Sequence, residues 1–193
     1  MAMGPDFSRA VREEDFAEVD ELLKAAFPTD AEARLVHRLR ADGDMQYECC
    51  KPWDGKIGGY YALSRMQAPQ GWACLAPMAV RPEWQGGSLA EQNPNMEVGG
   101  PKDEIYRAPW RFGSRLLQEL KAIYEIPIGR LPANVPQTVV VLGQPSFYGR
   151  FGFSHERAQK LKSAFPLEHT LILRDGDDVP EVELVYPRAF SDL

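Results

Sequence analysis

The chain has 193 residues, a length typical of a single domain. Hydrophobic residues make up 44% and charged residues 26%, which predicts a globular protein with a buried core. The 28 acidic side chains outnumber the 22 Lys and Arg, so the net charge is −6, and no basic run is present. This balance disfavours nucleic-acid binding and mildly favours cationic partners. No segment has the roughly 20 consecutive apolar residues of a membrane-spanning helix, so we expect no membrane association.

The cysteine and histidine residues predict neither a disulfide framework nor a metal site. The cysteines are Cys49, Cys50 and Cys74, and the histidines stand far apart, so no pair has zinc-ligand spacing. The first residues carry neither a basic start nor an apolar signal segment. Free thiols are typical of a reducing cytoplasm, where we expect this chain. Cys49 is predicted to be a small core residue instead of a reactive thiol.

Two helices are predicted after an extended start over residues 7–11. Apolar residues recur at helical spacing over 16–27. A second helix begins with a capping box, in which Thr29 is followed three residues later by Glu32, and it ends near Gly43.

Three strands are predicted next. Polar and apolar residues alternate over 45–49, and Asp54-Gly55 then favours a hairpin turn because both positions of a type I′ turn need a positive φ. The return strand covers 57–66, and a further strand covers 72–80. Pro77 donates no ladder hydrogen bond, so it predicts an edge, a bulge or a partner strand that has separated.

The second half opens with a long segment rich in Gly, Asn and Pro over about 86–109. At that length it is either functional or disordered; a lid, an oligomer contact and a solvated loop all stay open. The remaining elements are predicted as a helix over 112–124, a β-branched strand over 138–142, a short helix over 145–150, and strands over 167–173 and 182–186. The pattern alone predicts one α+β domain over 1–193 and names no reaction.

Two segments carry a more specific signal. The first reads Leu75-Ala-Pro-Met-Ala-Val-Arg-Pro-Glu-Trp-Gln85 and resumes at Arg111-Phe-Gly-Ser-Arg-Leu-Leu117; the second reads Val139-Val-Val-Leu-Gly-Gln-Pro-Ser-Phe-Tyr-Gly-Arg-Phe-Gly-Phe153. Together they resemble the GCN5-related N-acetyltransferase (GNAT) family, in particular its YhbS-like bacterial branch, over nearly the whole chain except 86–109. The resemblance implies an α+β fold with a mixed, mostly antiparallel central sheet that is flanked by helices and splayed between the fourth and fifth strands. It also implies a transferase that uses acetyl-CoA as co-substrate and no metal.

In this family the strand that ends at Val80 separates from the strand over 138–142, and the gap holds the pantetheine arm of acetyl-CoA. Unpaired backbone groups of the separated strand bond the amides of that arm, as another strand would. The resemblance therefore assigns cofactor contacts to Met78, Ala79 and Val80. An ordinary core strand would satisfy the same residue pattern.

The family's pyrophosphate loop, R/Q-x-x-G-x-G/A, leads into a helix whose unpaired N–H groups suit an anion. Gln85 matches its opening position and Gly113-Ser114 match its end, but the 86–109 insertion separates them and Arg111 stands where the first glycine is expected. Arg111 and Arg115 lie four residues apart, and cations at a helix N-terminus are unfavourable unless an anion is bound. We expect Gln85 and a run of five residues from the start of the helix to bind the phosphates, namely Arg111, Phe112, Gly113, Ser114 and Arg115.

Tyr148 is the candidate for chemistry. Attack of an amine on a thioester releases a thiolate, and a phenol near the sulfur can donate a proton to it. The family places a tyrosine for that role at this position of the second segment. The competing interpretation is an aromatic side chain that only fixes the short helix, as Phe147, Phe151 and Phe153 are expected to do.

No general base is assigned. Glu48 could serve through a water molecule, but a solvent-exposed strand glutamate is the preferred interpretation. The sequence thus predicts an N-acetyltransferase for a small-molecule or protein amine, acting in a ternary complex, with a homodimer left open. The alternative is a non-catalytic acyl-CoA-binding sensor or partner-binding domain with the same fold.

Overall fold

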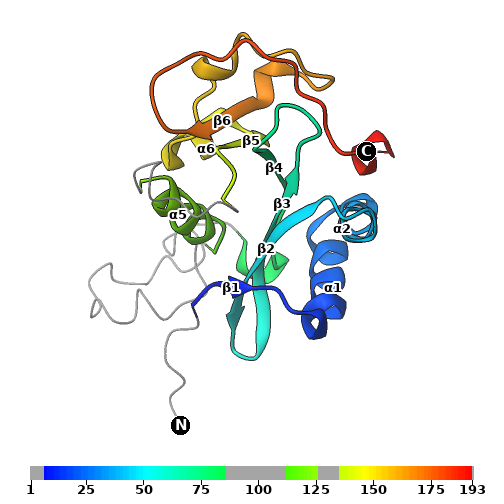
Figure 1. The fold of residues 1–193 in the computed structure, drawn as a ribbon. Helices are drawn as coiled ribbons and strands as arrows, with labels where there is room; N and C mark the ends of the chain where they lie inside the picture. Colours follow the sequence, from blue (N-terminus) through cyan, green and yellow to red (C-terminus); the bar gives the residue numbers. More distant parts are fainter. Residues whose placement is uncertain (1–6, 86–111, 126–134, 193) are drawn as a thin grey trace, which may run out of the picture.

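The computed structural model describes residues 7–85, 112–125 and 135–192 (Figure 1). The strands form one sheet in the order β1 to β6, in which every neighbouring pair is antiparallel except the parallel pair β4–β5. This confirms the predicted mixed, mostly antiparallel sheet. The strands are β1 (Arg9–Ala10), β2 (Met45–Trp53), β3 (Lys56–Arg65), β4 (Trp72–Val80), β5 (Thr138–Leu142) and β6 (Thr170–Arg174).

Helices cover both faces of this sheet. Figure 1 shows α1 (Phe16–Ala26) and α2 (Ala31–Ala41) on one face, and α5 (Phe112–Tyr124) on the other. The short helix α6 (Pro145–Tyr148) follows β5 and continues into a 3-10 turn over Gly149–Phe151. Each long helix buries the apolar side of its amphipathic pattern against the sheet, as its spacing predicts.

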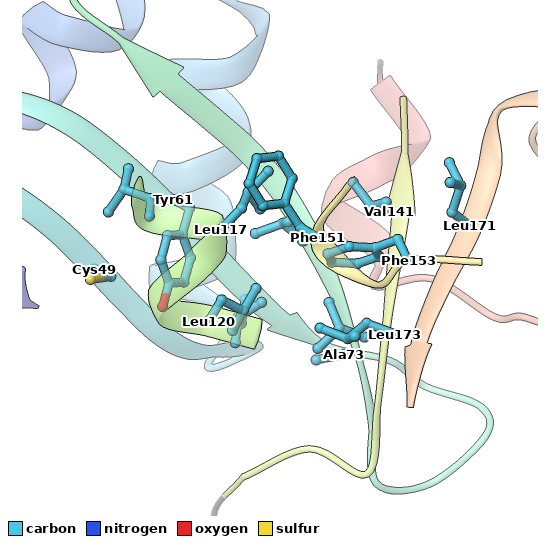
Figure 2. Close-up of a cluster of buried hydrophobic side chains, with 14 residues drawn as sticks. Cys49, Tyr61, Ala73, Leu117, Leu120, Val141, Phe151, Phe153, Leu171 and Leu173 are labelled. Carbon is cyan, nitrogen blue, oxygen red and sulfur yellow. The ribbon is translucent and has the colours of Figure 1, made fainter. Parts of the chain in front are cut away.

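The core is divided by the sheet. On the α5 face, Leu116, Leu117 and Leu120 pack on alternate strand residues and on Phe151 and Phe153, which follow α6 (Figure 2). The intervening strand residues, among them Cys74 and Val140, pack on the opposite face with α2 and the C-terminal segment. This period-two alternation is why one run of buried residues can serve two cores.

Two consecutive glycines in β3 let the α5 face come close to the sheet. A Cβ on Gly58 would lie 2.5 Å from the ring of Trp84 and 2.9 Å from that of Phe112. A Cβ on Gly59 would lie 2.9 Å from Leu116. Only glycine leaves this space, so the pair fixes how deeply the first turn of α5 sits on the sheet.

Three local predictions need correction. Residues 182–186 form no strand but isolated bridges, Lys162 with Glu183 and Ala68 with Val185, because the segment runs between two loops and has no continuous neighbour. The last strand begins at Thr170, after a 3-10 turn over Leu167–His169. The N-cap of α2 is Asp30, and the Thr29 hydroxyl accepts from Ala31 N, so the capping box is not formed.

In the part of the chain that the structure describes, no helix is long and apolar enough to cross a membrane. The 86–109 insertion and Arg111 lie outside the described residues.

Candidate functional site

The pairing of β4 with β5 stops halfway along β4. Parallel register runs from Trp72 opposite Thr138 to Leu75 opposite Val141. Beyond Leu75, β4 continues beside β3 alone, with Met78 opposite Tyr61 and Val80 opposite Gly59. The predicted splay between the fourth and fifth strands is therefore confirmed, and the buried Pro77 lies just past the point of separation.

The register with β3 decides which backbone groups face the gap. Arg81 N donates to Gly58 O at 2.9 Å, so this is a hydrogen-bonded pair. Antiparallel pairs alternate, which makes Tyr60 and Ala79 the next bonded pair. The backbone N–H and C=O groups of Met78 and Val80 consequently point to the side from which β5 has departed. Those of Ala79, one of the three predicted contacts, point to β3.

Gln85 closes part of this edge. Its side-chain amide donates to Val80 O at 2.7 Å, so one of the gap-facing carbonyls is bonded from within the chain. Gln85 is itself exposed at the end of the described segment. The predicted opening residue of the phosphate loop thus lies beside the separated end of β4.

The first turn of α5 forms a wall of the gap. A Cβ on Gly113 would lie 3.6 Å from Val80 Cγ2, 3.7 Å from Met78 Cε and 3.8 Å from Phe147 Cζ. The structure therefore brings together β4, α5 and α6, three elements that are far apart in sequence. The N–H groups at a helix N-terminus are hydrogen-bond donors suited to an anion.

The side chains of this turn have different surroundings. Phe112 is fully buried and packs on Trp84, with ring centroids 5.5 Å apart, so its side chain belongs to the core. Ser114 and Arg115 are partly exposed. Of the predicted loop residues that the structure describes, Gly113, Ser114 and Arg115 are thus the partly exposed ones, and Phe112 is not.

Tyr148 lies at the end of α6, with its ring stacked over the backbone of Gly143. A Cβ at Gly143 would overlap the Tyr148 ring. Edge-on contacts with Phe147 (centroids 5.1 Å apart) and Phe153 (5.6 Å) fix the ring from two other sides. Burial, with a smaller contribution from the Cys74 thiol, raises the pKa of Tyr148 to about 12. The phenol is accordingly protonated at neutral pH and can donate a proton.

A partly buried ion pair anchors the end of β4. Arg81 donates to Ile57 O at 2.8 Å and to Glu18 Oε1 at 3.0 Å, while Ile57 N donates to the same Glu18 oxygen at 2.7 Å. The guanidinium and carboxylate join α1, the β2–β3 hairpin and β4. This clamp supports the separated half of the strand from the face opposite α5.

Glu48 is not the exposed glutamate that the sequence favoured. Its carboxylate accepts from Arg40 Nη2 at 2.6 Å and from Tyr60 Oη at 2.7 Å, and its side chain is only 10% exposed. Both donors hold the carboxylate in the α1–α2 core, so Glu48 is a structural ion-pair partner there. Cys49 is buried as predicted, and burial raises the pKa of its thiol to about 11.

Sequence reasoning missed Gly143 and the pair of Arg81 with Glu18. A glycine directly after a β-branched strand and before the aromatic segment was a readable signal for close approach. The Arg81–Glu18 contact spans most of the N-terminal half and had no local signal. Among the described residues, no group of three His, Cys, Asp or Glu side chains is arranged to hold a metal ion.

No protein-family model matches the chain. The chain is 30% identical over 153 residues to the uncharacterised N-acetyltransferase YhbS of Escherichia coli (strain K12), a match that covers 77% of this chain and 73% of that protein. It is also similar to the crystal structure of YhbS from E. coli in complex with CoA, with a TM-score of 0.67, 27% identity, and coverage of 95% and 91% of the two chains. A GNAT acetyltransferase from Brucella melitensis in complex with acetyl-CoA shares the fold, with a TM-score of 0.64, 23% identity, and coverage of 96% and 97%.

Proposed function

Because the chain belongs to the GNAT family of N-acetyltransferases, in the branch of YhbS, we propose that it transfers the acetyl group of acetyl-CoA to a primary amine by direct attack in a ternary complex. The observation that carries this proposal is the gap between β4 and β5. The backbone of Met78 and Val80 lines its β4 side, and the Tyr148 ring packs on Gly143, directly after β5. The relative of known structure with 27% identity binds CoA.

The gap fits an extended ligand with amide groups. Met78 N–H, Met78 C=O and Val80 N–H line the open edge of β4, where the amides of the pantetheine arm can pair as a strand would. The first turn of α5, with Gly113, Ser114 and Arg115, receives the pyrophosphate at its N-terminus. Gly113 lies directly against the open edge of β4, since a Cβ on it would be within ordinary contact distance of Met78 and Val80.

The reaction needs no covalent enzyme intermediate. The neutral amine attacks the thioester carbonyl carbon, the carbon–sulfur bond breaks, and the amine nitrogen releases a proton. Backbone N–H groups at the gap edge stabilise the carbonyl oxygen as it gains negative charge. Tyr148 donates its phenolic proton to the departing sulfur, and its raised pKa means that the phenol carries this proton at neutral pH. No base is assigned.

Substitution of Tyr148 by Phe tests the proposal. We expect Tyr148→Phe to lower the transfer rate on a panel of primary amines by roughly a hundredfold or more, while the affinity for acetyl-CoA, measured by calorimetry, stays unchanged. Tyr47→Phe is the matched control, because Tyr47 is partly exposed on β2, two strands from β4. Full activity of Tyr148→Phe would refute its role as the proton donor. Saturable acetyl-CoA binding without turnover by the wild-type protein would instead support the sensor.

A further inference from the structure

A hollow of about 330 Å³ opens at the carboxyl end of β5, on the face of the sheet opposite Tyr148. Its lining comes from the end of β5 and from the loop before β6, and consists of Leu142, Gly143, Gln144, Phe165, Pro166 and His169. The two sides are joined directly, since Gly143 N donates to His169 O at 2.8 Å.

The end of β5 separates this hollow from Tyr148 by a single layer of backbone. Val139 and Val141 pack in the α5 core, whereas Val140 packs in the opposite core. By the same alternation Leu142 turns away from α5, toward the hollow, and Gly143 turns toward α5, where the Tyr148 ring covers it.

The hollow borders the gap between β4 and β5, because the pairing of these strands ends at Leu75 opposite Val141, directly before Leu142 and Gly143 of the lining. A nucleophile bound in the hollow therefore lies at the β5 side of this gap, next to Gly143, which the Tyr148 ring covers from the other face.

The lining is mostly apolar, with the Phe165 ring among its residues, and its polar side chains are those of Gln144 and His169. Phe165 stands edge-on to Tyr186, with ring centroids 4.9 Å apart, and also contacts Phe190 at 6.5 Å. It also borders a second hollow of about 490 Å³, along the segment 182–187. Among the described residues that line the first hollow there is no Asp, Glu, Lys or Arg. The described lining therefore offers no carboxylate to pair with the ammonium groups of a polyamine, whereas an aromatic ring can pack on Phe165, Pro166 and Leu142.

We propose that this hollow binds the body of the acceptor, and that the acceptor is a primary amine carrying an aromatic or other bulky apolar group. The inference rests on the proposed function and deepens it. The net charge of −6 alone favoured a cationic partner, but none of the described residues that line this hollow is acidic. Phe165 is the residue expected to determine specificity.

The test is calorimetric titration of the protein, saturated with CoA, with 2-phenylethylamine and separately with spermidine. We expect saturable binding of 2-phenylethylamine and binding of spermidine that is weaker by about tenfold or more. Phe165→Ala, and Phe165→Leu as a variant that keeps an apolar side chain, should each weaken 2-phenylethylamine by about tenfold. Phe7→Ala, at a phenylalanine that is 79% exposed, should change nothing.

The opposite results are distinguishable. Spermidine binding as tight as that of 2-phenylethylamine, or unchanged affinity in the Phe165 variants, would overturn the inference. So would saturable CoA binding with no binding of 2-phenylethylamine, and in that case the proposed function would stand. Failure of CoA and acetyl-CoA themselves to bind would overturn the proposed function and this inference together.

Discussion

The two halves of β4 are nearly equal in length but have different neighbours. From Trp72 to Leu75 the strand is paired on both edges, with β3 and β5, and every residue is buried. From Ala76 to Val80 it keeps β3 alone, and its other edge faces the gap beside α5 and α6. The same strand thus serves as core in one half and as a candidate binding edge in the other.

The two halves of β4 are held in place by different parts of the molecule. The paired half is held by the sheet and by both cores. The separated half lacks β5 and is held instead by the clamp of Arg81 with Glu18, by the Gln85 amide on Val80, and by the first turn of α5. Unpaired backbone polar groups at a strand edge cost free energy. We infer that these contacts hold the separated half of β4 in place although β5 no longer pairs with it.

The largest effect is expected from breaking the paired half. Leu75 is 3% exposed, and Leu75→Ala should lower the free energy of unfolding by about 2–5 kcal/mol, because it leaves a cavity in the core on the α5 face. Met78→Ala, in the half-buried separated part, should cost about 1 kcal/mol. Urea denaturation measures both. Equal losses at the two positions would contradict the distinction between the halves.

The next largest effect, on the transfer rate, is expected from displacing the Tyr148 ring. Gly143→Ala places a methyl group inside the Tyr148 ring position, so the ring must move, and we expect the transfer rate to fall roughly tenfold to a hundredfold. Gly149→Ala is the control, because a Cβ there meets nothing within 4 Å. Steady-state rates with saturating acetyl-CoA measure both. If the two alanine variants behave alike, the position of the Tyr148 ring does not matter for transfer.

A smaller effect is expected from loosening the clamp. Glu18→Gln removes the charge that holds Arg81 but keeps an oxygen for Ile57 N, so the end of β4 is loosened without being lost. We expect the affinity for acetyl-CoA to fall by about threefold. Glu14→Gln is the matched control, since Glu14 pairs with Arg12 at the exposed surface. An unchanged calorimetric affinity in Glu18→Gln would mean that the clamp does not support the binding edge.

The smallest effect is the one expected of pH. Because the pKa of Tyr148 is raised to about 12, the phenol stays protonated, and the transfer rate should change less than about twofold between about pH 8 and pH 10 for an amine that is already neutral there. The raised pKa of Tyr148 also contributes to the stability of the fold. This contribution is fully present below about pH 10 and is lost as the pH rises through about 12. A loss of rate with a midpoint below about pH 9 that disappears in Tyr148→Phe would contradict the assignment.

Most of the sheet was predictable because its signals are local. The bounds of β4 and β5 and the hairpin at Asp54-Gly55 follow from periodicity and turn residues. Pro77 alone left an edge, a bulge or a separated strand open, and it was the family resemblance that predicted the separation. The segment over 182–186 looked like a strand for the same reason. Whether an apolar alternation becomes a strand depends on a continuous neighbour, which local pattern does not show.

The site was predictable only in part. Met78, Val80, Gly113 and Tyr148 were reached through the family resemblance, and the structure brings them together. The difference between Ala79 and its two neighbours depends on the hydrogen-bond register with β3, which the sequence does not specify. Glu48 was misjudged because its partners, Arg40 and Tyr60, come from two other elements.

Amide hydrogen exchange at the separated half of β4, with and without acetyl-CoA, tests the central claim most directly. The Ala79 amide is bonded to β3, so it should exchange slowly in both states. The amides of Met78 and Val80 should exchange faster in the free protein and slow by about tenfold or more when acetyl-CoA is bound. Saturable binding of acetyl-CoA that leaves the exchange of Met78 and Val80 unchanged would contradict the account, because the ligand would then bind elsewhere than along this edge.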